Sequence, residues 1–329
     1  MTQRPDRGDV LVVSVGATTG WKAAARELAD GLERAGAAVR IASAPQPPEV
    51  RTFMLTDFVQ ARAARDVCRR AIAEREPSAI VYCSITAALL WPRTGAIWLD
   101  SLAAENRPGR HGIWQRVVER RRLAAAPLVL TMADSSLAPI PAGDRPDAVV
   151  VPVAVGPSGP PAPARDVDVL AYTGDPEKRR LDFILAAWQR ARRDGETLVV
   201  AGIDQARPPE GVRFTGRLAP DEYRALVRRA RVYVAAPRRE DFGIAPLEAL
   251  ADGCMLVTTP SPGPYPALGL ARALDPRLVD ANLVTGLRAA LDDPLPDYAS
   301  RAAQLLAPFS REAVDATISE RVVPRLLGP

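Results

Sequence analysis

The chain has 329 residues, 47% hydrophobic and 25% charged, a balance that excludes a disordered polypeptide and fits a globular protein of two domains. With a net charge of +4 and no basic strand studded with aromatic side chains, we expect no nucleic-acid partner. The polar N-terminus and the absence of any long apolar run predict a cytoplasmic protein without a signal peptide or a membrane span. Arginine stands in place of lysine everywhere except at Lys22 and Lys178, which indicates a GC-rich, bacterial genome.

The cysteines and other potential ligands predict neither a disulfide framework nor a metal site. Cys68, Cys83 and Cys254 are an odd number at unrelated spacings, which fits a reducing cytoplasm. No cluster of His, Cys and carboxylate residues is visible, so we expect no metal.

Short apolar runs alternate with segments of helical period along the first half of the chain. This alternation is typical of parallel sheets with crossover helices. A helix is expected over 22–36, where Gly36 suits the C-terminal cap. The predicted strands are 10–15, 38–43, 79–83, 96–100, 128–132 and 148–153.

The same alternation resumes after a stretch rich in proline and glycine. Strands are expected at 167–173, 197–202, 212–216, 231–237 and 254–259, with helices at 180–195, 220–230 and 245–253. We therefore predict two doubly wound, Rossmann-like α/β domains whose parallel sheets face each other across a ligand-binding cleft. The predicted divisions are an N-terminal domain (1–155), a linker (156–166), a C-terminal domain (167–310) and a C-terminal helix (311–329) that can return to the N-terminal domain.

The stretch RREDFGIAPLEALADGC, 238–254, joins a predicted strand to a predicted helix. The helix should begin near Ile244 or Ala245, so its free N–H groups form a positive end suited to a phosphate, and Gly243 permits close approach. Glu248 in the first turns can complement the helix dipole, or it can accept two hydrogen bonds from a ribose diol. Glu240, at the strand exit, can accept bonds from a sugar ring beyond the phosphates.

The spacing from Glu240 to Glu248 resembles the E-x7-E signature of retaining glycosyltransferases of the GT-B fold, family 4 type. The segments VLAYTGDPEKRRLDFILAAW, TLVVAG and VRFTGRLAPDEYRALVRRARVYVAAP are similar to the same family in order and spacing. The resemblance covers Val167 to Pro260 well and the first half loosely.

The resemblance implies roles for residues of the second half. Glu248 would bind the donor ribose, Glu240 would contact the transferred sugar, and Lys178 would neutralise the leaving nucleotide diphosphate; Lys178 can instead be an ordinary solvated loop residue. The nucleobase would pack near Arg217 and Leu218. The remaining donor-binding candidates are Gly16, Gly174, Arg179, Phe242, Gly243, Ile244 and Ala245.

Two positions depart from the family pattern. Asp175 stands where family members carry an Arg, so Arg179 or Arg180 would have to compensate. Leu99 stands where they often carry a His, and the one histidine, His111, lies in a predicted loop and is not assigned a catalytic role.

The first half offers a glycine loop and an acceptor side. Gly16 and Gly20 follow the first strand, but the G-x-x-x-G spacing and the absence of an acidic residue after the second strand argue against NAD binding, and a tight turn is the alternative.

Asp100, at a strand end, is the better acceptor-side candidate, with Asn106 and Arg110 in the arginine-rich segment 106–123. This segment is either a solvated helix packed by one apolar face, or a site for an anionic acceptor or anionic lipid headgroups. That apolar face would contain Ile113, Trp114, Val117 and Val118.

These features together predict a metal-independent, retaining glycosyltransferase that needs no cofactor. It would move a sugar from a nucleotide-diphosphate sugar to a carbohydrate, lipid-linked or small-molecule acceptor, with peripheral contact to an anionic membrane as one option. The alternatives are a catalytically silent nucleotide-binding or scaffold protein of the same fold, a nucleotide-sugar epimerase, and a phosphorylase, which usually has a far longer chain. The D-x-D pattern at Asp166 and Asp168 lies at a strand entry and is interpreted as coincidence.

Overall fold

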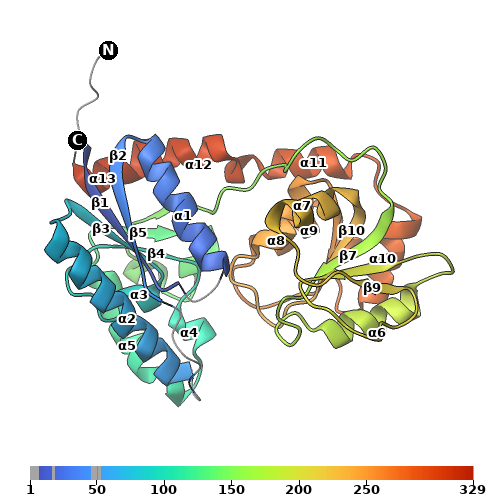
Figure 1. Ribbon diagram of the computed structural model, residues 1–329, viewed down its shortest axis with the longest axis horizontal. Coiled ribbons are helices and arrows are strands. Elements are labelled where there is room, and N and C mark those ends of the chain that lie inside the picture. Colours follow the sequence, from blue (N-terminus) through green and yellow to red (C-terminus); the bar gives the residue numbers. More distant parts are fainter. Residues whose placement is uncertain (1–6, 17–18, 46–49, 51–52, 329) are drawn as a thin grey trace, which may run out of the picture. The chain divides into compact units, whose positions relative to one another are not determined.

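A computed structural model describes residues 7–16, 19–45, 50 and 53–328. Its internal contacts divide the chain into two compact units: unit 1 comprises 1–154 and 311–329, and unit 2 comprises 155–310. Each unit contains one parallel sheet, drawn in Figure 1.

Unit 1 has a six-stranded sheet in the order β2-β1-β3-β4-β5-β6, in which every neighbouring pair is parallel. Residues alternate between the two faces along each strand, so Leu11 and Val13 join one core with Cys68 while Trp98, on the other face, contacts Trp21 of α1. The strands are β1 (Arg7–Ser14), β2 (Ala37–Ser43), β3 (Ala79–Cys83), β4 (Ala96–Leu99), β5 (Val129–Thr131) and β6 (Ala148–Val150).

The helices of unit 1 follow its strands as crossovers. The larger ones are α1 (Thr19–Arg34), α2 (Phe53–Glu74) and α5 (Ile113–Ala125), and the shorter ones are α3 (Ile85–Ala88), α4 (Ala103–Asn106), η1 (Arg110–Gly112), η2 (Asp134–Leu137) and η3 (Ala142–Asp144). At the C-terminus, α12 (Arg311–Thr317) and the π-helical turn η6 (Ile318–Val322) pack against α1. The last helix, α13 (Val323–Leu327), follows η6, and all three belong to this unit.

Unit 2 has a five-stranded parallel sheet in the order β11-β10-β7-β8-β9. Its strands are β7 (Val167–Tyr172), β8 (Leu198–Ala201), β9 (Val212–Phe214), β10 (Ala230–Ala235) and β11 (Met255–Thr258). The connecting helices are α6 (Leu181–Ala191), α7 (Pro220–Arg229), α8 (Ile244–Ala251) and α9 (Pro266–Leu274), followed by η4 (Pro276–Leu278), α10 (Leu283–Asp292), α11 (Tyr298–Leu305) and η5 (Ala307–Phe309). The two parallel α/β folds that the sequence predicts are confirmed, with strand bounds that differ by a few residues.

The predicted apolar face of α5 is only partly buried, because Trp114, Val117 and Val118 are half-buried and Ile113 is exposed. The side chains that α5 buries are Gln115, Glu119 and Leu123, whereas Ile113 is 52% exposed. Two of the three buried side chains are polar because each has a distant partner: Gln115 bonds Asp57 of α2, and Glu119 accepts the N–H of Ala103 at 2.8 Å. Burial of a polar group is tolerated when it is hydrogen-bonded.

Two further properties concern the redox state of the cysteines and the apolar character of the helices. Cys68, Cys83 and Cys254 are buried free thiols. Among the described residues, no helix has the length and apolar character that crossing a bilayer requires.

Candidate functional site

Three loops meet where strands of unit 2 reach their carboxyl ends. The N–H of Gly202, after β8, donates to the carbonyl of Gly216, after β9, at 2.9 Å. A Cβ on Gly202 would lie 2.7 Å from the backbone N of Gly174, after β7. Gly174, a predicted donor-site residue, therefore lies at the carboxyl edge of the sheet, where the backbones pack closely. Ligands of open parallel sheets bind at this edge.

A tight turn after Gly174 presents two cations. The Asp175 carboxylate accepts the N–H of Lys178 at 3.0 Å, and the Asp175 carbonyl accepts the N–H of Arg179 at 3.0 Å. Aspartate is favoured where its side chain can bond the backbone of such a turn. Asp175 therefore shapes the turn that carries Lys178 and Arg179.

These cations meet the buried carboxylate of Glu240, which is only 5% exposed. Lys178 Nζ lies 3.7 Å from Glu240 Oε1, and Arg179 forms an ion pair with Oε2. Arg180 instead places its guanidinium over the ring of Phe183, 4.0 Å from the centroid. Asp175 stands where family members carry an arginine, and Arg179 and Arg180 are the two candidates to compensate. Of these two, Arg179 contacts Glu240 and Arg180 does not.

The loop after Glu240 leads directly into α8, which begins at Ile244 as predicted. Gly243 has a φ of +78°, and a Cβ there would lie 2.9 Å from the ring of Tyr265, so glycine is required on both counts. No side chain caps the start of α8, which leaves the first N–H groups near Ile244 and Ala245 for a ligand. Phe242 is buried against Phe309, so it can offer a ligand only its backbone.

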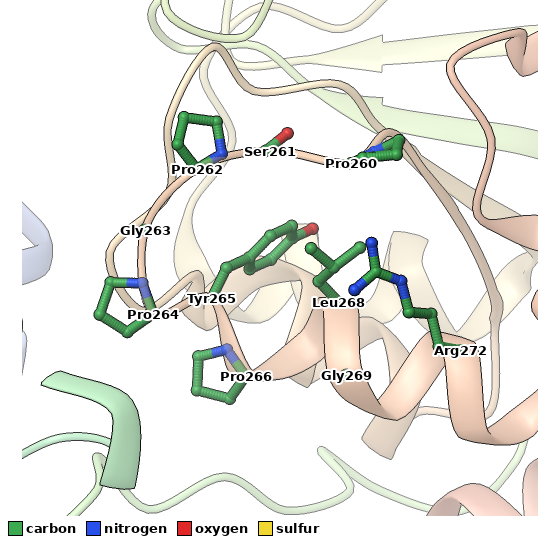
Figure 2. Close-up of a pocket in the computed structure, with 10 residues that line it drawn as sticks. All are labelled: Pro260, Ser261, Pro262, Gly263, Pro264, Tyr265, Pro266, Leu268, Gly269 and Arg272. Carbon is green, nitrogen blue, oxygen red and sulfur yellow. The ribbon is translucent and has the colours of Figure 1, made fainter. Parts of the chain in front are cut away.

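A proline-rich loop between β11 and α9 holds the Glu240 segment in place. The N–H of Glu240 donates to the carbonyl of Pro262 at 3.1 Å, and a Cβ on Gly263 would lie 2.2 Å from the Glu240 carbonyl oxygen. Figure 2 shows the ring of Tyr265 beneath this loop, and its hydroxyl lies 3.2 Å from Thr258 Oγ1. The pocket of about 540 Å³ drawn there is lined by Pro260–Pro266, Leu268, Gly269 and Arg272.

Glu248 has a different set of neighbours on α8. Arg224 of α7 lies 2.8 Å from Glu248 and 2.9 Å from Asp252, so one guanidinium holds both carboxylates. Burial raises the pKa of Glu248, and the positive charge of Arg224 opposes that rise. Arg224 also donates to the carbonyl of Gly156 at 2.9 Å, and this third bond fixes the orientation of its guanidinium.

Arg217 and Leu218 follow Gly216 in the loop between β9 and α7. Arg217 is exposed and Leu218 is half-buried. The loop lies at the carboxyl edge of the same sheet, where the family resemblance places the nucleobase. That role stays a prediction.

Two predicted residues of unit 1, Gly16 and Asp100, lie at the carboxyl ends of strands β1 and β4. Gly16 has a φ of +60°, and a Cβ there would lie 2.3 Å from the carbonyl oxygen of Ala44, so a tight turn alone requires this glycine. Asp100 accepts the N–H of Ser101 at 2.7 Å, and Asn106 donates to the Ser101 hydroxyl at 2.9 Å. The structure therefore brings Asp100 and Asn106 together around Ser101, while Arg110 is exposed in η1. The side chain of His111 lies outside the described residues.

The D-x-D pattern has a structural explanation. Asp166 pairs with Arg229 at 2.5 Å and Asp168 with Arg231 at 3.1 Å, at the entry of β7. Within the described ranges, no group of three His, Cys, Asp or Glu residues is arranged to hold a metal ion.

Sequence reasoning missed Arg224, Asp252 and Tyr265. One signal was available: Glu248 and Asp252 are like charges four residues apart on one helix, and such a pair needs a cation beside it. Nothing in the local sequence tells which arginine supplies that charge, because Arg224 is 24 residues from Glu248.

Residues 167–308 match the model of the family described as glycosyl transferases group 1. The matched range contains Lys178, Arg179, Glu240 and Glu248 together with Arg224. A curated relative, a glycogen synthase of Mycobacterium tuberculosis, is 38% identical over 144 residues, which cover 38% of this chain and 34% of the relative. The chain thus spans about a third of the length of this relative.

Two solved structures share the fold of the chain. A sucrose-phosphate synthase from Thermosynechococcus elongatus superposes with a TM-score of 0.73 at 16% identity, covering 95% of this chain and 97% of that chain. WaaG, a glycosyltransferase involved in lipopolysaccharide biosynthesis, gives 0.69 at 14% identity, covering 98% and 100%. These neighbours confirm the GT-B fold class, while the match to group 1 glycosyl transferases is confined to unit 2.

Proposed function

We propose that the protein is a glycosyltransferase that moves a sugar from a nucleotide-diphosphate sugar to an acceptor hydroxyl, with retention of configuration and without a metal or other cofactor. The observation that carries this proposal is the cluster of Glu240, Lys178 and Arg179 beside the uncapped start of α8. Cations and free N–H groups at one place suit a diphosphate, and a carboxylate among them suits the hydroxyls of the attached sugar. The match of residues 167–308 to group 1 glycosyl transferases supports the same assignment.

In this proposal each group has one task. Glu248, held by Arg224, accepts hydrogen bonds from the ribose hydroxyls, and the backbone of Phe242–Ala245 binds the diphosphate. When the donor binds, Lys178 and Arg179 exchange Glu240 for the phosphates, so the Glu240 carboxylate can bind the sugar. The two cations then stabilise the negative charge that develops on the leaving diphosphate. A leaving phosphate oxygen takes the proton of the incoming hydroxyl, in a front-face displacement of the family 4 type.

The acceptor is assigned to unit 1, where Asp100 and Asn106 meet at Ser101 after β4 and Arg110 is exposed in η1. Carbohydrate, lipid-linked and small-molecule acceptors all fit this assignment. We place the protein in the cytoplasm, in line with its free thiols, with peripheral contact to an anionic membrane.

A panel of nucleoside diphosphates and nucleotide sugars in a thermal-shift assay tests the donor site. Glu248→Ala and Lys178→Ala should each reduce the shift, with binding weaker by about 30-fold because a charged hydrogen bond of ~2 kcal/mol is lost. Glu210→Ala, at an exposed carboxylate of the same unit, is the control and should leave the shift unchanged. If no nucleoside diphosphate stabilises the parent protein, the donor site is wrong.

Product analysis tests the reaction class. Transfer with retention gives a glycoside whose anomeric configuration equals that of the donor. Conversion of the donor alone, without acceptor, would indicate an epimerase instead.

A further inference from the structure

Unit 1 contains a cavity of about 1120 Å³ that the donor site does not use. It lies beside the crossover from β5 to β6, residues 132–147, all of which are described. This crossover contains the short turns η2 and η3 and no α-helix. Residues of this crossover and of α5 line the cavity together.

Eleven of the seventeen residues that line the cavity are apolar, and the other six are charged. Leu102, Leu123, Leu128 and Ile140 contribute aliphatic side chains, and several prolines complete the wall. A cavity of this size and character is typical of small-molecule sites, which combine apolar walls with a few placed polar groups.

One polar group in the cavity is a buried carboxylate. Glu119 is 3% exposed and lines the cavity from α5. Its Oε2 accepts the N–H of Ala103 at 2.8 Å, and no hydrogen bond to its Oε1 is found among the described residues. That oxygen keeps some exposure, and Glu119 is one of the residues that line the cavity, so we take Oε1 as the acceptor available to a ligand there. Burial raises the pKa of Glu119 to about 7, as expected for a carboxyl that lacks a second donor.

The charges around Glu119 decide what kind of donor fits. Arg116 and Arg120 line the same cavity and act on Glu119 through their positive charge. Asp144, Asp147 and Arg325 also line the cavity, and Arg325 pairs with Asp147. With Glu119 ionised, the lining has three cationic and three anionic side chains and no net charge, so the complementary donor is a neutral hydroxyl group.

We propose that this cavity binds a hydroxylated apolar small molecule, whose hydroxyl group donates to Glu119 Oε1 while its apolar body contacts Leu123, Leu128 and Ile140. All the lining residues belong to unit 1. The proposal therefore does not depend on the transfer activity assigned to unit 2.

The test uses 2-naphthol as the probe and 2-methoxynaphthalene as the matched ligand without a donor, titrated calorimetrically into the full chain at pH 8. We expect 2-naphthol to bind with a Kd below about 1 mM and 2-methoxynaphthalene to bind about tenfold more weakly. Absence of 2-naphthol binding, or equal affinity for the two compounds, would overturn the proposal.

Two variants locate the binding. Ala124→Trp places a large side chain in the cavity from an exposed position of α5, and it should abolish binding of 2-naphthol. Ala125→Trp is the matched control, since Ala125 is exposed on the same helix and does not line the cavity. Glu119→Gln keeps an acceptor for Ala103 and should weaken 2-naphthol binding about tenfold. If Ala124→Trp binds the probe as the parent does, the site is elsewhere and the proposal fails.

Discussion

At the scale of single residues, Arg224 fixes the orientation in which the Glu248 carboxylate can bind a ligand. Its planar guanidinium pairs with Glu248 and Asp252 at once. A lysine cannot make both bonds in this fixed geometry, because its ammonium group is a single point charge. In Arg224→Lys we expect nucleoside-diphosphate affinity to fall about tenfold, ~1.4 kcal/mol, since Glu248 loses its fixed orientation. The loss should deepen as the pH is lowered, because weaker pairing raises the pKa of Glu248 further.

Calorimetric titration at two pH values checks this prediction. Arg229→Lys, in the same helix but paired with Asp166 at the strand entry, is the control and should bind as the parent does. An unchanged affinity in Arg224→Lys would show that Glu248 is not a ribose ligand or does not depend on Arg224.

Glu119 gives a pH prediction that is independent of any ligand. Its pKa is raised from the ordinary value of 4.5 to about 7, so the folded state binds a proton that the unfolded state releases between these values. This contribution to stability is complete below pH 4.5 and is lost as the pH rises to 7, by up to about 3 kcal/mol. Glu119→Gln removes the titration.

Melting temperatures of the parent and of Glu119→Gln between pH 5 and pH 8 check this. The parent should lose stability relative to the variant as the pH rises. A constant difference between the two proteins would mean that Glu119 titrates normally.

At the scale of elements, the first turns of α2 and α5 form one exposed apolar surface. Met54, Leu55 and Phe58 of α2 and Ile113 of α5 are all exposed, and the ring of Phe58 lies 6.3 Å from that of Trp114. Two exposed arginines lie near it: Arg62, one turn after Phe58 on α2, and Arg110 of η1, which contacts α2. Exposed apolar side chains with arginines nearby suit the interface of an anionic bilayer.

We expect sedimentation of the protein with vesicles that contain phosphatidylglycerol and little with vesicles of phosphatidylcholine alone. Leu55→Glu should reduce the bound fraction about tenfold, because it replaces a partly inserted aliphatic side chain worth ~1.5 kcal/mol with a repelled charge. Leu305→Glu, at an exposed leucine of unit 2, should have no effect. Equal losses in both variants would exclude this surface as the contact.

The secondary-structure elements also show which features of the fold can be predicted from the sequence. Buried parallel strands are predictable because they are continuous apolar runs, as 79–83 and 198–201 illustrate. The start of α8 is predictable because Gly243 and Pro246 mark it locally. The buried face of α5 is not, since its polar members depend on partners 16 and 58 residues away.

At the scale of the whole molecule, unit 1 is built from both ends of the chain. Arg34 of α1 binds Asp315 at 2.7 Å, and Arg325 of α13 binds Asp147 at 2.9 Å. Ile318, Val322 and Val323 are buried, and Gly31 of α1 lies so close to Ile318 that a Cβ there would be 2.6 Å from its Cδ1. The C-terminal helices are thus part of the core of unit 1, although more than 150 residues of unit 2 separate them from its strands.

A chain that ends at Ser310 should therefore lose stability in unit 1 and keep the donor site. Removal of at least three buried aliphatic side chains is expected to cost unit 1 about 5 kcal/mol, at ~1.5–3 kcal/mol each. Unit 2 retains all of its residues, so nucleoside diphosphates should still raise its melting temperature. Calorimetry of the full and shortened chains, with Ile318→Ala as a milder variant expected to cost ~2–4 kcal/mol, separates the two transitions. Loss of the nucleotide-dependent shift in the shortened chain, with unit 1 unaffected, would contradict this assignment of the C-terminal helices.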